Sequence, residues 1–424
     1  MRKSRRWLLL SSLVVILAMV MVSVGTTASK VQIRVSSWDG YLADTWKQVI
    51  TEFEKENPNI DVEIGFAEFT TYWQRLMTES LTGTAADVTQ NMVGNIIDYA
   101  KMKAVKNLAP YVKRDLNMKD YFPVMFDPYY YPLGKTTSPL YAVPFISFDM
   151  VMFYNKTIFD KYGVTYPDSA TWSWDAFLDA AKKTTKDTNG DGVNEIWGFD
   201  ANPTHDQIYP WISTAGGRWW DASYKKCMIS SPESVNGSQF FFDLISKYKV
   251  APSPANRMQG IVPFMSGQIA MAIDGTWNME MFRQIKDFGW DIADIPYGKV
   301  RGGYSMPGTM AIPATCKHTA EAWKFIKFLI GEKAQVILAQ GGYGIPINRA
   351  AAATFFDPQK HPAGLKAILN RLGAKNYFWI MNAKASEYRK AYEDEMMLVG
   401  LGKKDLKQAL DDATVKINKI EAAK

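Results

Sequence analysis

The stretch that decides the fold runs from residue 31 to residue 90 and contains three strand-like segments separated by two helical ones. The strands read Val31-Gln32-Ile33-Arg34-Val35, Ile60-Asp61-Val62-Glu63-Ile64 and Ala86-Asp87-Val88-Thr89-Gln90. Alternation of apolar and polar residues with a period of two is typical of strands. Between them, residues 42–56 and 72–81 repeat apolar residues at helical spacing. Strands that alternate with helices predict an α/β fold, in which helices connect the strands of a parallel sheet.

The same pattern returns after residues 121–144, a segment rich in Pro and Tyr that predicts a long ordered loop. Further strands are expected at residues 150–154, 269–273 and 309–312. Further helices are expected at residues 156–162, 174–185, 232–248 and 319–331, and from residue 385 to the C-terminus. With 424 residues, the chain is long enough for two or three folding units.

The first thirty residues have the order of a secretory signal peptide. Four basic residues within positions 2–6 precede a charge-free stretch from Trp7 to Val24, and small residues follow. Cleavage is expected near Ala28, which makes residues 1–28 the signal peptide. The apolar stretch is also just long enough to span a membrane, so an uncleaved N-terminal anchor is the alternative. Either arrangement predicts an exported protein, periplasmic or held at the cell surface.

The net charge and the two cysteines exclude several classes of protein. Removal of the four basic residues of the signal peptide lowers the formal charge from +6 to about +2. Such a charge is too small for a phosphate-binding surface, so no nucleic-acid partner is expected. Cys227 and Cys316 are the only cysteines, which excludes a disulfide-rich scaffold.

The motifs of common enzyme classes are missing. His205, His318 and His361 lack metal-binding spacing, and no nucleophile elbow, P-loop or dinucleotide motif occurs. The glycine-rich residues 341–344 follow a predicted helix and are expected to end it. His205 falls in a predicted loop, where it either contacts a ligand or has no special role. A carboxylate pair for glycoside hydrolysis stays open, because 43 acidic residues always offer pairs.

One segment has the spacing of a metal site. Residues 187–195 read DTNGDGVNE and match the first part of a calcium-binding loop. The expected oxygen ligands are Asp187, Asn189, Asp191, Val193 through its carbonyl group, and Glu195. Gly198 stands where such a loop has its closing Glu, so the site is incomplete. The alternative is a surface turn held by its own side chains. No cofactor is expected to be required, and a structural calcium ion at this loop is the one candidate.

Several segments match the sequence signatures of one protein family. Residues 140–144 (LYAVP) and 151–156 (VMFYNK) form the most specific pair, and weaker matches occur at residues 86–88, 267–277, 320–329 and 344–346. Together they resemble the extracellular solute-binding proteins of sugar ABC importers, the family that includes maltose-binding protein. The resemblance extends from residue 31 to about residue 353.

The resemblance implies two lobes, each a mainly parallel sheet flanked by helices, joined by a hinge of three crossing segments. The N-lobe is expected to contain residues 30–145 and 309–344, and the C-lobe residues 146–308 and 345–424. The crossings then fall near residues 144–149, 306–309 and 344–346. Cys227 and Cys316 lie in different lobes of this arrangement, and we predict free thiols.

A cleft that holds a sugar needs aromatic platforms for the apolar faces and polar side chains for the hydroxyl groups. The chain has 14 Trp, 21 Tyr and 22 Phe, and some follow predicted strand ends or crossings, where ligands of α/β sheets bind. The candidates are Trp38, Asp39, Phe148, Asp149, Trp211, Arg218, Trp219, Asp274, Trp277, Tyr304, Tyr343 and Trp379. Trp46, Trp174 and Trp323 lie on helical stripes and are assigned to the core.

The resemblance implies capture without chemistry. A carbohydrate, an oligosaccharide rather than a monosaccharide on the number of aromatic residues, is held between the lobes and delivered to the membrane permease of an ABC importer. A monomer is expected. Two alternatives stay open: a binding protein for a non-sugar solute on the same fold, and an exported carbohydrate-active enzyme.

Overall fold

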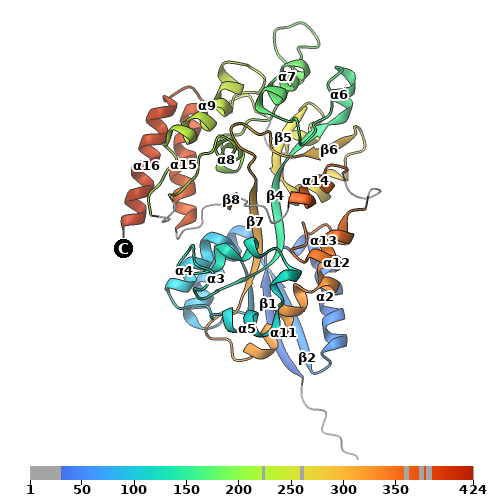
Figure 1. The fold of residues 1–424 in the computed structure, drawn as a ribbon, viewed down its shortest axis with the longest axis vertical. Coiled ribbons are helices and arrows are strands. Elements are labelled where there is room, and N and C mark those ends of the chain that lie inside the picture. Colours follow the sequence, from blue (N-terminus) through green and yellow to red (C-terminus); the bar gives the residue numbers. More distant parts are fainter. Residues whose placement is uncertain are drawn as a thin grey trace, which may run out of the picture.

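The chain forms two α/β lobes stacked along its long axis (Figure 1). The computed structural model describes residues 30–221, 225–257, 262–357, 362–371, 377–378 and 384–423. The predicted signal peptide and Trp379 lie outside these residues. No helix among the described residues is long and apolar enough to cross a membrane.

The first lobe confirms the strand and helix pattern that opens the chain. Its sheet has β1 (Val31–Ser37) between β2 (Ile60–Phe66) and β3 (Val88–Asn91), and both pairs are parallel. The connections are α2 (Ala43–Glu56) and α3 (Phe69–Thr82). Trp46 and Phe53 of α2 are fully buried, so the apolar stripe of this helix faces the core.

Further helices cover this sheet and end where their sequences indicate. The α-helices are α4 (Val93–Lys101), α5 (Ala109–Asp115), α11 (Thr319–Leu329), α12 (Glu332–Gln340) and α13 (Arg349–Phe355). The 3₁₀ helices are η1 (Gly40–Leu42), η2 (Met118–Asp120) and η3 (Pro123–Tyr129). Gly341 follows α12 as its C-cap, which confirms that the glycine-rich segment ends this helix.

Two strands run between the lobes. β4 (Val143–Asn155) pairs along its first half with β7 (Tyr304–Ala311), from Val143 opposite Met310 to Asp149 opposite Ser305. β7 is also antiparallel to β3 of the first lobe. The second half of β4 belongs to the second lobe, so a single strand passes through both sheets (Figure 1).

The described strands of the second lobe pair differently from the expected parallel arrangement. β5 (Met271–Gly275) and β6 (Trp290–Ala293) are both antiparallel to β4. Apolar alternation identifies a strand but carries no information on its direction, which explains the difference. The short β8 (Tyr377–Phe378) pairs in parallel with β7.

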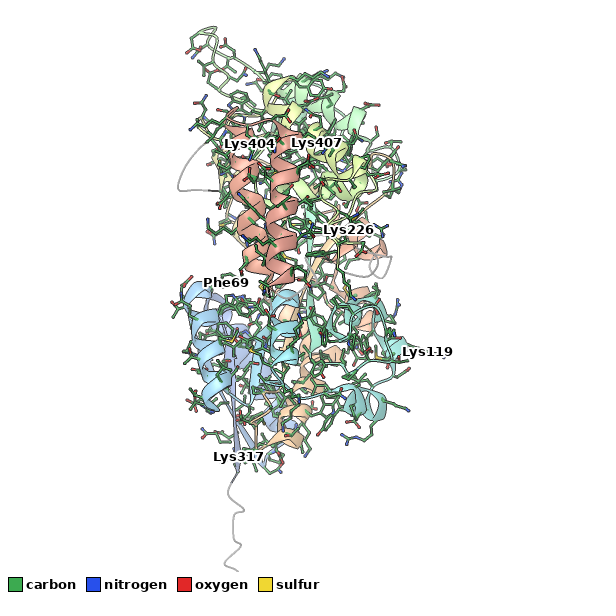
Figure 2. All side chains as sticks on the ribbon, turned by 90° about the vertical axis from the view of Figure 1, so that its left-hand side faces the viewer. Phe69, Lys119, Lys226, Lys317, Lys404 and Lys407 are labelled. Atoms are coloured by element: carbon green, nitrogen blue, oxygen red, sulfur yellow. The ribbon has the colours of Figure 1, made fainter. Side chains whose placement is uncertain are left out.

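The helices of the second lobe cover both faces of this sheet, because alternate residues of β4 pack in two different apolar clusters. A C-terminal helical hairpin lies along the side of the lobe (Figures 1 and 2). The helices are α6 (Lys156–Lys161), α7 (Trp174–Thr184), α8 (His205–Thr214), α9 (Pro232–Ser246), η4 (Pro263–Ser266), η5 (Thr276–Asn278), α10 (Met279–Phe282), α14 (Leu365–Arg371), α15 (Ala385–Gly400) and α16 (Leu406–Ala422).

Residues 345–355, which the sequence places in the second lobe, pack with the first. The backbone of Asn348 pairs with Tyr121, and α13 packs against α12. Ile345 pairs with Ser147 of β4, so this segment also lies beside the hinge. The chain therefore stays with the first lobe through α13, and α14 packs on β6 of the second.

The cysteines and two of the three helical tryptophans lie as predicted. Cys227 is buried, Cys316 is partly buried, and both are free thiols. Trp46 and Trp323 are buried core residues. Trp174 is only half-buried and stacks on Phe240 with ring centroids 4.3 Å apart.

Candidate functional site

A cavity of about 510 Å³ lies between the lobes. Both lobes and the two connecting strands contribute to its walls. The lining residues are Trp38, Asp39, Tyr41, Phe69, Met92, Phe148, His205, Asp206, Trp277, Asn278, Met281, Met306, Pro307, Gly308 and Arg389. Segments far apart in the sequence therefore meet at this one place.

The wall on the first lobe is aromatic. Trp38 directly follows β1, and its indole packs edge-on against Phe69 at 5.7 Å and Tyr72 at 5.3 Å between ring centroids. Trp73 lies 5.0 Å from the same indole. Phe69, at the start of α3, is 44% exposed and lies at the boundary between the lobes (Figure 2). The neighbouring rings hold Trp38 in place while its remaining surface faces the cavity.

A buried carboxylate lies beside this aromatic wall. Asp39 accepts a hydrogen bond from the side-chain amide of Gln90 at 2.6 Å and another from the hydroxyl group of Tyr343. Burial raises the pKa of Asp39 to about 6, and the two hydrogen bonds oppose this rise. These hydrogen bonds fix the orientation of the Asp39 carboxyl group at the surface of the cavity. Tyr343 lies behind Asp39 and is fully buried.

The opposite wall carries Trp277, in the turn that directly follows β5. Its ring meets Phe148 of β4 edge-on at 6.1 Å between centroids. A Cβ atom on Gly275 would lie 2.1 Å from the Trp277 ring, so only glycine leaves room for this orientation. The cavity therefore has an indole group from each lobe, with a phenyl group from the hinge strand beside Trp277.

A second cavity of about 600 Å³ adjoins the first through Asp206, Trp277 and Met281, which line both. Its walls are more polar. The other polar lining residues are Asn202, Thr204, Gln207, Arg257 and Asp274. Arg257 is held by Asp200 through two hydrogen bonds of 2.6 and 2.8 Å.

Asp274 is the most perturbed acid of the second cavity. Burial raises its pKa to about 7, and the carboxylates of Asp206 and Asp200 add to the rise. Its Oδ1 accepts a hydrogen bond from the backbone N–H of Gly275 at 2.7 Å. The two adjoining cavities thus combine aromatic surface with carboxyl, amide and guanidinium groups, which is the composition that a polyhydroxylated ligand needs.

The structure brings five of the predicted ligand-binding residues to these cavities: Trp38, Asp39, Phe148, Asp274 and Trp277. The prediction is wrong for Trp211 and Trp219 as cleft residues. Trp211 is 0% exposed and packs between Phe177 and Phe199, because residues 205–214 form a buried helix rather than a loop. Trp219 is 3% exposed and packs on Tyr392 of α15.

Four more candidates serve other roles, lie elsewhere or have side chains outside the described residues. Asp149 is fully buried inside the hinge, where it accepts hydrogen bonds from Ser147 and Ser305. Arg218 is exposed and is not among the residues that line either cavity. Tyr304 begins β7, but its side chain is outside the described part of the chain, as is Trp379.

Some polar lining residues that sequence reasoning missed lie near predicted positions, and one does not. Tyr41, Asp206 and Asn278 lie within two residues of positions that the sequence singled out, so a wider window around each strand end finds them. Arg389 comes from the C-terminal hairpin, and no local pattern marks it.

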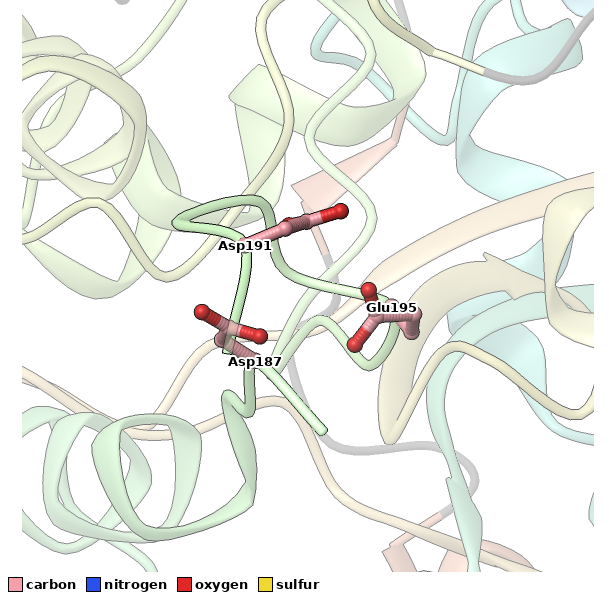
Figure 3. A group of neighbouring side chains, drawn as sticks. All are labelled: Asp187, Asp191 and Glu195. Carbon is pink, nitrogen blue, oxygen red and sulfur yellow. The ribbon is translucent and has the colours of Figure 1, made fainter. Parts of the chain in front are cut away.

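The predicted calcium loop brings three carboxylates together at the surface of the second lobe (Figure 3). Ligand atoms of Asp187, Asp191 and Glu195 lie within 4.8 Å of one another. Asp187 accepts hydrogen bonds from the backbone N–H groups of Gly192 at 2.8 Å and Gly190 at 2.6 Å, which lower its pKa. The side chain of Asn189 donates to Asp191 at 3.1 Å. The donor set fits Ca²⁺, and the same hydrogen bonds hold the turn without an ion.

The family model of the bacterial extracellular solute-binding proteins matches residues 39–336. The chain belongs to this family. A putative binding protein of Brucella abortus is 22% identical over 407 residues, which cover 93% of each chain. An ABC substrate-binding protein of Listeria monocytogenes, solved in complex with cycloalternan, has a TM-score of 0.78 and 25% identity over 93% of this chain and all of its own.

A maltose/maltodextrin-binding domain of Bdellovibrio bacteriovorus, solved with maltotriose, has a TM-score of 0.73 and 19% identity over 92% of this chain and 99% of its own. These relatives confirm the two-lobed fold. Members of the family are binding proteins found outside the cytoplasm, and the cavity of about 510 Å³ lies at the interface of the two lobes, a usual place for a ligand site.

Proposed function

We propose that the protein captures a carbohydrate between its lobes and delivers it to the membrane permease of an ABC importer. The observation that carries the proposal is the pairing of two indoles from opposite lobes, Trp38 and Trp277, with the carboxyl groups of Asp39 and Asp274. Indole faces pack on the apolar faces of sugar rings, and carboxyl groups accept hydrogen bonds from ring hydroxyls. The solved relatives with cycloalternan and maltotriose support the same class of ligand.

The ligand acts by shifting a conformational equilibrium. It contacts both lobes at once and therefore favours the arrangement in which both walls reach it. β4 and β7, together with the segment around Ile345, form the hinge about which the lobes move. No bond is made or broken. The protein acts as an exported monomer in this scheme, with residues 1–28 removed or retained as an anchor.

The size of the site favours an oligosaccharide. Cavities of about 510 and 600 Å³ share three residues, so a ligand that fills the first extends into the second past Trp277. The aromatic first cavity and the polar second cavity would then contact different rings of the same ligand.

A thermal-shift screen of the mature protein tests the class of ligand. Maltose, maltotriose and longer gluco-oligosaccharides are compared with glucose, spermidine and inorganic phosphate, because a bound ligand raises the melting temperature by mass action. We expect shifts with the oligosaccharides. A shift with spermidine or phosphate and none with any sugar would sink the carbohydrate proposal in favour of a non-sugar solute.

Variants of the two indoles test the site. Trp38→Ala and Trp277→Ala should each weaken sugar binding by roughly 10- to 100-fold, the loss of one buried aromatic contact. Trp174→Ala is the matched control, because Trp174 stacks on Phe240 and lines neither cavity. Equal affinity in all three variants contradicts this site.

Incubation of the protein with the bound oligosaccharide separates capture from catalysis. We expect the sugar to be recovered unchanged. A hydrolysis product that disappears in Asp274→Asn would instead support an exported carbohydrate-active enzyme.

The loop at residues 187–195 holds a structural calcium ion in this proposal, away from any chemistry. Calcium should raise the melting temperature of the wild type relative to EDTA, and Asp187→Asn should remove the difference. Asp179→Asn is the control, since Asp179 is an exposed acid on α7 that pairs with Lys183. No effect of calcium on the wild type means that the loop is a self-stabilised turn.

A further inference from the structure

A buried histidine lies between two carboxylates at the wall of the candidate cleft. His205 begins α8 and is 1% exposed. Its Nδ1 atom lies 2.7 Å from Oε1 of Glu393 on α15, and its Nε2 atom lies 2.8 Å from Oδ1 of Asp206. The backbone N–H of His205 also donates to Oε1 of Glu393, at 3.1 Å. The ring is thus held by Glu393 of the C-terminal hairpin, with Nε2 within ion-pair distance of Asp206.

Asp206 has a special position, because it lines both cavities. One of its carboxylate oxygens lies 2.8 Å from Nε2 of the His205 imidazole. A carboxylate accepts several hydrogen bonds, so the group retains capacity for the hydroxyl groups of a ligand. The residue is placed to contact a sugar at the junction where an oligosaccharide passes from one cavity to the other.

The charged groups around His205 decide its protonation. Burial opposes the charged ring, but Asp206 on α8 and Glu393 on α15 outweigh it and raise the pKa of His205. Arg389, one helical turn before Glu393, lies 3.3 Å from both carboxylate oxygens of Glu393 and opposes the rise weakly. Across the second cavity, Asp274 and the Arg257–Asp200 pair face Asp206.

We propose that Asp206 is a ligand-binding residue at the junction of the two cavities, and that His205, held by Glu393, is its positioning residue. This rests on the proposed carbohydrate function of the cleft. A protonated imidazole donates from both nitrogens, so one N–H holds Glu393 and the other orients the Asp206 carboxylate. A neutral imidazole has a single N–H and leaves one of the two carboxylates facing a nitrogen lone pair.

The consequence is a pH dependence of ligand binding with a definite sign. Affinity is highest while His205 is protonated and falls as the pH rises through its raised pKa. Glu393 sets the pH at which the affinity falls, although it lines neither cavity.

The first experiment needs no ligand. The chain has three histidines, so the imidazole signals of the full mature protein can be followed by NMR and assigned with His318→Gln and His361→Gln. We expect His205 to titrate above its ordinary value of about 6.5. Glu393→Gln should lower that midpoint by about one pH unit or more. Asp394→Asn is the matched control, because Asp394 is the next residue of α15 and forms an exposed pair with Lys390.

The second experiment measures maltotriose affinity by calorimetry between pH 5.5 and 9. Asp206→Asn and His205→Gln should weaken binding about tenfold or more, as expected for loss of a hydrogen bond to a charged group. His205→Gln should also lose the pH dependence. In Glu393→Gln the midpoint of the affinity profile should move down together with the NMR midpoint, whereas Asp394→Asn should match the wild type.

Each outcome decides a different claim. A wild-type midpoint at or below 6.5, or one that Glu393→Gln leaves unchanged, overturns the positioning role. An Asp206→Asn variant that binds maltotriose as tightly as the wild type overturns its role in binding. Wild-type protein that binds no sugar at any pH overturns the carbohydrate function and Asp206 as a sugar ligand, while the NMR titration still tests the positioning independently.

Discussion

The carboxylate of Asp39 accepts a hydrogen bond from the hydroxyl group of Tyr343, a residue 304 positions later in the chain. Gln90 donates to the same carboxylate oxygen and also lies 2.7 Å from the Tyr343 hydroxyl. Three segments of the first lobe thus meet at one atom on the cavity wall. Tyr343 was expected to contact the ligand, yet it is buried behind Asp39 and supports it from the protein side.

Replacement of Tyr343 by phenylalanine should loosen this support without leaving a large void. We expect Tyr343→Phe to lower the free energy of unfolding by about 1–3 kcal/mol, the usual effect of removing a hydrogen bond to a buried carboxyl group. Sugar affinity should fall as well, because Asp39 loses its orientation. Urea denaturation and calorimetry measure the two effects. Tyr111→Phe is the control, since Tyr111 packs on Trp323 and lines neither cavity; equal losses in both variants would contradict the prediction.

A methyl group at residue 275 should displace Trp277 from the cavities. The Cβ atom of Gly275→Ala would lie 2.1 Å from the indole, and the ring must rotate or shift to relieve this contact. We expect a loss of sugar affinity close to that of Trp277→Ala, and a change in tryptophan fluorescence. Gly65→Ala in β2 is the control, because a Cβ atom there has no neighbour within 4 Å. Unchanged affinity in Gly275→Ala means that Trp277 does not bind the ligand.

The raised pKa of Asp274 predicts how the free energy of unfolding varies with pH. Its pKa in the folded protein is about 7, against an ordinary value of 3.8, so the folded state binds the extra proton between these values. The ligand-free protein should therefore lose stability as the pH rises from about 4 through 7, as far as this group contributes.

The substitution Asp274→Asn removes this titration. At pH 8 it should raise the melting temperature of the ligand-free protein, by roughly 2–4 °C for each 1 kcal/mol gained, while it weakens sugar binding. At pH 4 the variant and the wild type should melt together. Calorimetric scans at the two pH values test both statements. If the variant and the wild type differ in melting temperature by the same amount at both pH values, the charge of Asp274 does not affect stability.

The lobes also touch away from the hinge. The carboxylate of Asp98 on α4 accepts a hydrogen bond from the backbone N–H of Lys384, which precedes α15 of the second lobe, at 3.2 Å. The ammonium group of Lys384 donates to the carbonyl groups of Ile420 and Ala423 at the end of α16. A first-lobe acid is therefore bound to the base of the C-terminal hairpin.

Removal of the hydrogen bond between Asp98 and Lys384 should favour arrangements in which the two lobes lie farther apart. We expect Asp98→Ala to increase the radius of gyration of the ligand-free protein in small-angle X-ray scattering and to weaken sugar binding about 3- to 10-fold, the effect of about 1 kcal/mol. Asp44→Ala, an exposed acid in the first turn of α2, is the control. A radius and an affinity equal to those of the wild type would rule out a role for this contact.

Local patterns predicted the elements well and the long-range neighbours poorly. The strands and helices of residues 31–91 follow from alternation and apolar stripes, because each is a property of a few adjacent residues. Trp38 and Trp277 were found because both directly follow strands. Trp211 was misplaced because no helix was predicted at residues 205–214, whereas the structure forms α8 there and continues it through Pro210. Glu393 reaches His205 across 188 residues, and no spacing in the sequence marks such a contact.

Because the strand β4 belongs to the sheets of both lobes, neither lobe has a complete sheet without the other. The 13 residues of β4 are hydrogen-bonded to β7 in one lobe and to β5 and β6 in the other. A fragment cut at residue 149 would leave each half with an unpaired strand edge, which invites aggregation. Expression of either lobe alone is therefore expected to fail. A reporter domain is best inserted in the exposed turn at residues 134–137, which leaves the shared strand whole.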